Sequence, residues 1–259
     1  MEHKVNQTKL KVLILCAGLL GAGLRAVLYA TGTDEKGLLI DGHWAHTALL
    51  ALTFLVALLL VFFCRGIQGP EDSRDSFPPV LLPALGSLIG AAGFCITGLS
   101  DLKAAAFQLD RVTAWLCLGS AAALGYTAVC RFLGRLPFFG AHALVCITFG
   151  LRMVCQYRLW SADPQLQDYV FYMLAHVGLM LTAYHLSAFD ARMGHHRTLW
   201  FLGLFSAYLS LLCLCSCGNS LFMLCCALWA LMGLSNLTPR RRRVRPSMET
   251  GEEMPDEHT

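Results

Sequence analysis

Residues 44–64 read WAHTALLALTFLVALLLVFFC, an apolar run without a single lysine, arginine, aspartate or glutamate. A helix rises about 1.5 Å per residue, so a run of this length crosses the roughly 30 Å hydrocarbon core of a bilayer. Lipid offers no hydrogen-bond partner to an open strand edge, so the run is expected to be a helix. Similar runs lie at residues 10–30, 80–99, 112–130, 138–155, 169–189, 199–217 and 221–236. The sequence therefore predicts an all-α, polytopic transmembrane helix bundle of about eight spans.

The composition agrees with this prediction. The chain has 259 residues, of which 56% are hydrophobic and only 14% charged, and the mean hydropathy is +0.56. An average soluble domain has about 25% charged residues. These values exclude a soluble globular enzyme, a disordered chain and a secreted disulfide scaffold. We expect one transmembrane domain over residues 1–236 and a tail over residues 237–259.

The distribution of basic residues predicts the orientation. With the N-terminus inside, fourteen of the twenty Lys and Arg residues lie in inner segments, four in outer segments and two within spans. Because inner loops of membrane proteins are enriched in Lys and Arg, this split predicts a multi-pass protein of the cell membrane with both termini cytoplasmic. The first run is interpreted as an uncleaved signal anchor.

The tail carries five arginines, at residues 240–243 and 245, followed by acidic residues. A basic cluster directly after the last span is typical of a stop-transfer signal that faces anionic lipid. The tail is short, lacks aromatic residues and carries its own acids, so membrane lipids and not nucleic acid are the expected partners.

Most of the twelve cysteines lie inside the apolar runs, where a free thiol behaves as a small hydrophobic group. Cys213, Cys215 and Cys217 form a C-x-C-x-C run, but a helix spreads these side chains over different faces. We therefore predict packing and no bound metal there. A disulfide between Cys155 and Cys217 stays open as an alternative.

Two short segments suggest an internal repeat. Gly23–Val27 reads GLRAV and Gly150–Val154 reads GLRMV, with an offset of 127 residues, close to half the chain. Four spans per half would give two parallel repeats, at residues 10–130 and 137–236, related by an axis along the membrane normal. A chance match of five residues is the alternative.

Small residues favour close helix packing. Gly86 and Gly90 form a G-x-x-x-G pattern in the third run, and small residues at this spacing let membrane helices approach closely. We interpret the pattern as packing within the chain. A homo-oligomer or hetero-oligomer through the Gly-rich spans is the alternative.

The arginines within spans are the leading candidates for a site. Arg25 and Arg152 occupy matching positions of the two halves, each a few residues before an outer loop. Ionisable residues are costly inside a membrane, and the planar guanidinium binds carboxylate or phosphate through two parallel bonds. We predict that both arginines flank one outward-facing cavity and hold a small anionic or amphipathic ligand. The alternative is a structural ion pair of either arginine with Asp34, Asp41, Asp163 or Asp168.

Three further residues are predicted to orient this ligand. His46 lies three residues after His43, on the same face at the outer start of the second span. Tyr172 and His176 lie one turn apart in the sixth span and extend a polar stripe from its outer end. His-x-x-His without a third ligand is a weak metal signal, so no cofactor is predicted.

His142 and His185 lie at similar depth near the inner ends of two neighbouring spans, which leaves a bis-histidine haem or metal site open. No carboxylate lies in the middle of a span, and the chain contains no H-E-x-x-H, G-x-S-x-G or Walker A pattern. The sequence thus favours a protein that is not an enzyme.

The stretch from Leu24-Arg25 through Thr31-Gly32-Thr33-Asp34-Glu35-Lys36-Gly37-Leu38-Leu39 to Gly42-His43 resembles uncharacterised multi-pass membrane proteins of bacteria. The resemblance implies no activity. The leading hypothesis is transport or binding of a small anion, with Arg25 and Arg152 binding its charge. The alternatives are a non-catalytic membrane scaffold or accessory subunit, and an intramembrane enzyme acting on a lipid or quinone.

Overall fold

The computed structural model describes residues 2–32, 43–65, 81–160, 169–215 and 219–234. These residues form eight α-helices, one short 3-10 helix and no strand. The helices are α1 (Glu2–Thr31), α2 (Trp44–Cys64), α4 (Leu81–Ala104), α5 (Gln108–Phe132), α6 (Phe139–Trp160), α7 (Val170–Asp190), α8 (His196–Leu212), η2 (Cys213–Cys215) and α9 (Ser220–Gly233). The all-α prediction is confirmed.

The lengths of the helices support a multi-pass integral membrane protein. Seven of the described helices are long and apolar enough to cross a membrane. The helix in the last predicted span, α9, has 14 residues and rises only about 21 Å, less than the hydrocarbon thickness. The predicted cytoplasmic side of the termini stays a prediction, and the tail over residues 237–259 lies outside the described residues.

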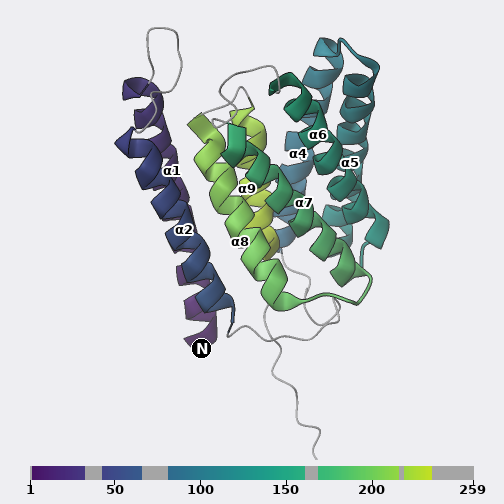
Figure 1. Cartoon of the computed structure of the whole chain (residues 1–259). Helices are drawn as coiled ribbons and strands as arrows, with labels where there is room; N and C mark the ends of the chain where they lie inside the picture. The colour runs from purple at the N-terminus through teal and green to yellow at the C-terminus, as the bar shows by residue number, and fades with distance from the viewer. Residues whose placement is uncertain (1, 33–42, 66–80, 161–168, 216–218, 235–259) are drawn as a thin grey trace, which may run out of the picture.

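Six of the helices form a closed ring. Each helix from α4 to α9 packs against the next in the chain, and α9 returns to pack against α4. The α1–α2 hairpin lies outside this ring and packs on α8 (Figure 1). The ring therefore brings α4, α5, α6, α7 and α9 around a common interior.

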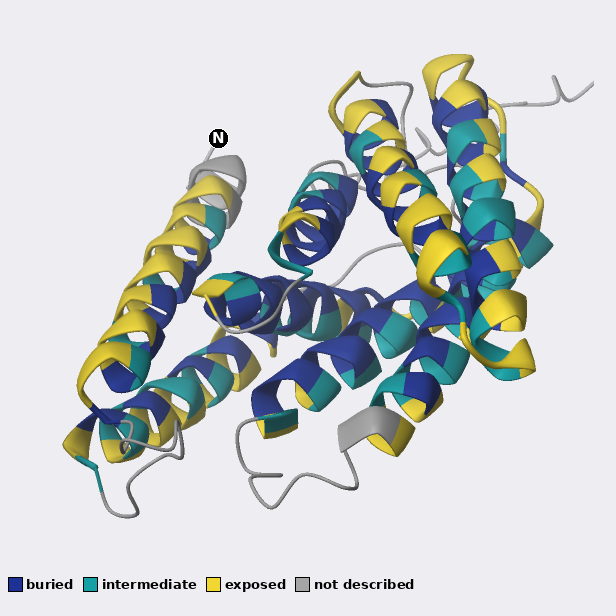
Figure 2. Ribbon diagram, turned by 90° about the horizontal axis from the view of Figure 1, so that it is seen from above, coloured by how far each residue is buried: buried dark blue, intermediate teal, exposed yellow. Residues whose placement is uncertain are grey.

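Burial follows the arrangement expected in lipid. The interior holds fully buried large side chains, including Phe94, Phe149, Trp200 and Trp229. The outer faces of the peripheral helices are exposed (Figure 2), and the exposed side chains there are largely apolar, such as Phe54 on α2 at 72% exposure. An exposed apolar surface of this kind is the face that a membrane protein presents to lipid tails.

The glycines of α4 pack within the chain. A Cβ atom added to Gly86 would lie 2.6 Å from the Cβ of Met232, and one added to Gly90 would lie 3.1 Å from the Trp229 ring. The G-x-x-x-G face is thus covered by α9, as the packing interpretation predicted. An oligomer, which no described contact tests, would need a different face of α4.

The helix pairings of the two halves differ. In the predicted repeat, the pair α7–α8 would correspond to the pair α2–α4. Helix α7 packs closely on α8, whereas the close neighbours of α2 among the described residues are α1 and α8. The four-plus-four repeat stays a prediction.

Candidate functional site

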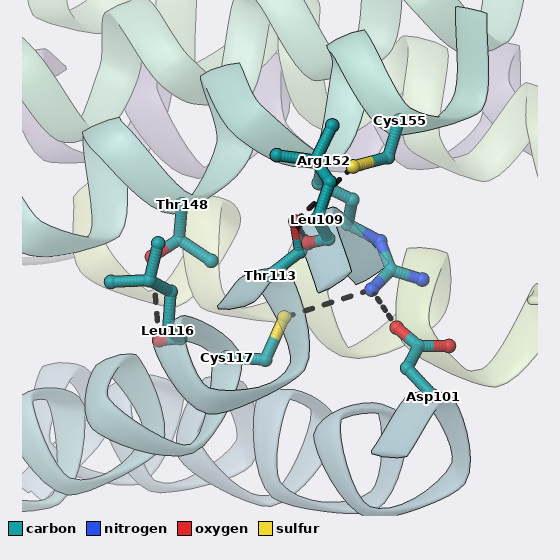
Figure 3. A network of polar contacts seen from close by, with 8 residues as sticks. All are labelled: Asp101, Leu109, Thr113, Leu116, Cys117, Thr148, Arg152 and Cys155. Atoms are coloured by element: carbon teal, nitrogen blue, oxygen red, sulfur yellow. Dashed lines mark hydrogen bonds and ion pairs between the residues drawn. The ribbon is translucent and has the colours of Figure 1, made fainter. Parts of the chain in front are cut away.

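The site is built around Arg152, which α6 directs into the ring. Arg152 is 1% exposed, and its Nη1 donates to Oδ2 of Asp101 on α4 at 2.5 Å (Figure 3). The same nitrogen lies 3.7 Å from Sγ of Cys117 on α5. The Asp101 side chain is 34% exposed, so the ion pair joins a buried cation to an anion at the end of α4.

An aromatic ring covers the guanidinium of Arg152. The Cζ atom of Arg152 lies 4.7 Å from the centroid of the Phe222 ring on α9. A cation over an aromatic face is attracted by the ring quadrupole, more strongly where water is excluded. Phe222 itself packs edge-on against Phe94 at a centroid distance of 5.1 Å, so the aromatic side chain that covers Arg152 is fixed in the core.

The remaining edge of this guanidinium makes no hydrogen bond within the described part of the chain. The Nε and Nη2 atoms of Arg152 are buried and make no hydrogen bond to any described residue. Together these two N–H groups form the fork that binds a carboxylate or phosphate through two parallel bonds. Buried donors without partners are costly, above all on a charged group. The arrangement therefore leaves two buried donors that a bound oxyanion would satisfy.

Tyr172 and His176 lie beside this arginine on α7. Both are buried, and their rings stack obliquely with centroids 4.4 Å apart. Each lies within electrostatic range of the Arg152 guanidinium. His176 Nδ1 lies 3.0 Å from the main-chain oxygen of Tyr172, and its Nε2 is buried without a described partner. The structure thus brings together three of the five predicted site residues.

A cavity of about 230 Å³ opens at this end of the ring. Its wall consists of the end of α4, the start of α5 and the neighbouring part of α6, with Asp101, Thr113 and Arg152 among the lining residues. At the α5 side, Arg158 donates to Asp110 at 2.8 Å and covers the Phe107 ring at 4.6 Å. Most of the lining surface is apolar, which suits a small or amphipathic anion.

Arg25 occupies a different environment. It is 2% exposed and lies near Tyr29 Oη at 3.4 Å, Cys213 Sγ at 3.6 Å and the Phe171 ring at 5.5 Å. Arg25 is not among the residues that line the cavity at Arg152. The described residues therefore show two buried arginines with separate sets of partners, and a common cavity for both stays a prediction.

The acids named as alternative partners for the arginines, Asp34, Asp41, Asp163 and Asp168, lie outside the described residues. The observed partner of Arg152 is Asp101, which the sequence analysis did not select. Phe222 and Cys117 were missed as well, because apolar residues in separate spans give no sequence signal that they meet at one arginine.

His46 is half-buried on α2, and no described contact links it to Arg152. Its neighbour His43 caps this helix, since the His43 ring accepts from the Ala45 main-chain N–H at 3.3 Å. Further along α2, Thr53 Oγ1 and Tyr208 Oη on α8 lie 3.0 Å apart. His43 thus caps α2, and Thr53 joins α2 to α8.

His142 pairs with a carboxylate. Its Nδ1 lies 2.6 Å from Oδ2 of Asp190 at the end of α7, and both side chains are buried. His185 is not part of this pair. Among the described residues no group of three or more His, Cys, Asp or Glu side chains is arranged to hold a metal ion.

The alternative of a disulfide between Cys155 and Cys217 stays untested, because Cys217 falls outside the described residues. Cys155 Sγ lies 3.2 Å from Thr113 Oγ1.

No protein-family model matches this chain, and neither a curated protein nor a solved structure matches it.

Proposed function

We propose that this integral membrane protein binds a small anionic or amphipathic ligand at Arg152, and that the ligand enters through the cavity between α4, α5 and α6. The observation that carries the proposal is the buried Nε and Nη2 edge of Arg152, which makes no hydrogen bond to any described residue. A ligand oxyanion would satisfy both donors at once. Transport of the same ligand across the membrane is the wider form of this hypothesis.

Asp101 has a definite part in the proposal. Its carboxylate holds Nη1 of Arg152 at 2.5 Å and also lines the cavity. An entering anion therefore meets a resident carboxylate on the same guanidinium. We infer that Asp101 competes with the ligand and keeps the positive charge balanced while the site is empty.

The test measures binding of benzoate, an amphipathic carboxylate, to the detergent-solubilised protein by saturation-transfer NMR. Arg152→Gln should weaken binding by more than tenfold, because it removes the charged fork. Asp101→Asn should strengthen binding, because it removes the competing charge. Arg25→Gln is the matched control: it also removes a buried arginine from a helix long enough to span a membrane, and should leave benzoate binding unchanged.

Thermal unfolding of each variant, measured without ligand, separates loss of binding from loss of folding. Benzoate binding that is equal in the wild type and in folded Arg152→Gln would overturn the proposal. The ion pair with Asp101 would then be structural, and the scaffold hypothesis would lead.

A further inference from the structure

Two buried side chains beside Phe222, His176 and Arg152, differ in hydrogen-bonding character. His176 Nδ1 faces the main-chain oxygen of Tyr172 at 3.0 Å, and a carbonyl oxygen can only accept. The proton of the neutral ring therefore sits on Nδ1, which leaves Nε2 as an acceptor. A doubly protonated ring would place a second positive charge in a buried position within range of Arg152.

Beside Phe222, the described residues thus present one buried acceptor and two buried donors for which no hydrogen bond is found. The acceptor is Nε2 of His176, and the donors are Nε and Nη2 of Arg152. Both side chains approach the same ring: Phe222 lies 4.7 Å from Cζ of Arg152 and 6.3 Å, centroid to centroid, from His176. A complementary ligand offers two acceptor oxygens and one donor hydroxyl.

We infer that the ligand held at Arg152 is a small oxyanion that carries a hydroxyl hydrogen of its own, and that His176 selects for that hydrogen. Bicarbonate and short 2-hydroxycarboxylates belong to this class. The inference rests on the proposed function, since Arg152 binds the charge. A simple carboxylate satisfies Arg152 but leaves Nε2 of His176 buried without a donor.

The discrimination has a physical basis. A site built to hydrogen-bond a ligand hydroxyl rejects an analogue that lacks it, because the polar group of the protein is then left unpaired. Nitrate and bicarbonate are both planar three-oxygen monoanions, and only bicarbonate carries a hydrogen. Glycolate and acetate form a second pair that differs by one hydroxyl. These pairs isolate the hydrogen from charge and size.

The experiment measures the affinities of bicarbonate, nitrate, glycolate and acetate for the full-length protein by isothermal titration calorimetry at mildly alkaline pH, where bicarbonate predominates. The wild type should prefer bicarbonate to nitrate, and glycolate to acetate, by about ten- to a hundredfold. His176→Phe should abolish both preferences while nitrate and acetate still bind. His176→Gln, which restores an acceptor, should recover part of the preference. Nitrate binding by His176→Phe itself shows that this variant is folded.

The outcomes separate the two claims. If all four anions bind equally and are all lost in Arg152→Gln, the selection by His176 is overturned and the proposed function stands. If none of them binds the wild type, and benzoate does not bind either, both claims fail. An unchanged preference in His176→Phe would also overturn the inference, because the hydrogen would then be recognised elsewhere.

Discussion

The close contact of α4 with α9 gives a prediction whose size follows from the structure. In Gly93→Ala, the new Cβ would lie 2.5 Å from the Cβ of Cys225, whereas carbon atoms in contact prefer about 3.5–4.0 Å. Both Cβ atoms are fixed by the backbone, so no rotation of a side chain relieves the clash. The two helices must move apart locally by about 1 Å, and overpacking of this kind typically costs about 1–3 kcal/mol.

A second glycine provides the control. A Cβ added to Gly125 on α5 meets no heavy atom within 4 Å. Replacing a glycine in a helix interior by alanine gains about 1 kcal/mol of helix propensity, and this gain is shared by both variants. The difference in unfolding free energy between Gly125→Ala and Gly93→Ala therefore isolates the clash, and we expect about 1–3 kcal/mol.

The assay is reversible unfolding in mixed micelles of a mild detergent and dodecyl sulfate, followed by far-UV circular dichroism. Equal stability of the two variants would refute the packing described for α4 and α9. If Gly93→Ala instead changed only the oligomeric state, the glycine face would be an interface between chains, as the alternative interpretation of the G-x-x-x-G pattern holds.

Three further predictions concern other contacts. In the same unfolding assay, Asp190→Ala should cost about 1–3 kcal/mol, because it leaves a buried nitrogen of His142 without its hydrogen-bond partner. Asp110→Ala, whose partner Arg158 is partly exposed, should cost at most about 1 kcal/mol. Equal losses would contradict the burial of His142. A double-mutant cycle of Ser120→Ala and Thr148→Val, whose hydroxyl oxygens lie 2.7 Å apart between α5 and α6, should give a coupling of about 0.6 kcal/mol, and zero coupling would mean that the two helices do not meet there. Cys215 is exposed at the end of η2. In a variant with every other cysteine replaced by serine or alanine, it should react with a membrane-impermeant maleimide added to intact cells if the N-terminus is cytoplasmic. Labelling only after cell lysis would reverse the predicted orientation.

The sequence predicted the helices well because each membrane span must satisfy its own backbone, so the signal is local. Residues 44–64, expected as a span, form α2 with the same bounds. The 14-residue α9 is shorter than the run that predicted it, because apolar composition marks membrane preference and not the residue at which a helix ends.

The site was predictable only in part. Arg152, Tyr172 and His176 stood out because polar groups are conspicuous in apolar runs, and the structure places them together. Arg25 stood out for the same reason but has other neighbours, and no described contact links His46 to Arg152. Which polar residues meet depends on how the ring closes, and no pattern within one span contains that information. Asp101 lies near the end of α4, where a carboxylate resembles an ordinary loop residue.

The ring of six helices has a consequence for biogenesis. Its closing contact joins α4 to α9, which is made more than a hundred residues later, and the α1–α2 hairpin packs on α8, also made late. During synthesis, the glycine face of α4 and the inner face of α1 must therefore remain in lipid without their final partners. Ribosome-bound chains that stop before α9 should present these unpaired faces to membrane chaperones and quality-control proteases, so assembly of this protein depends on its last-made helices.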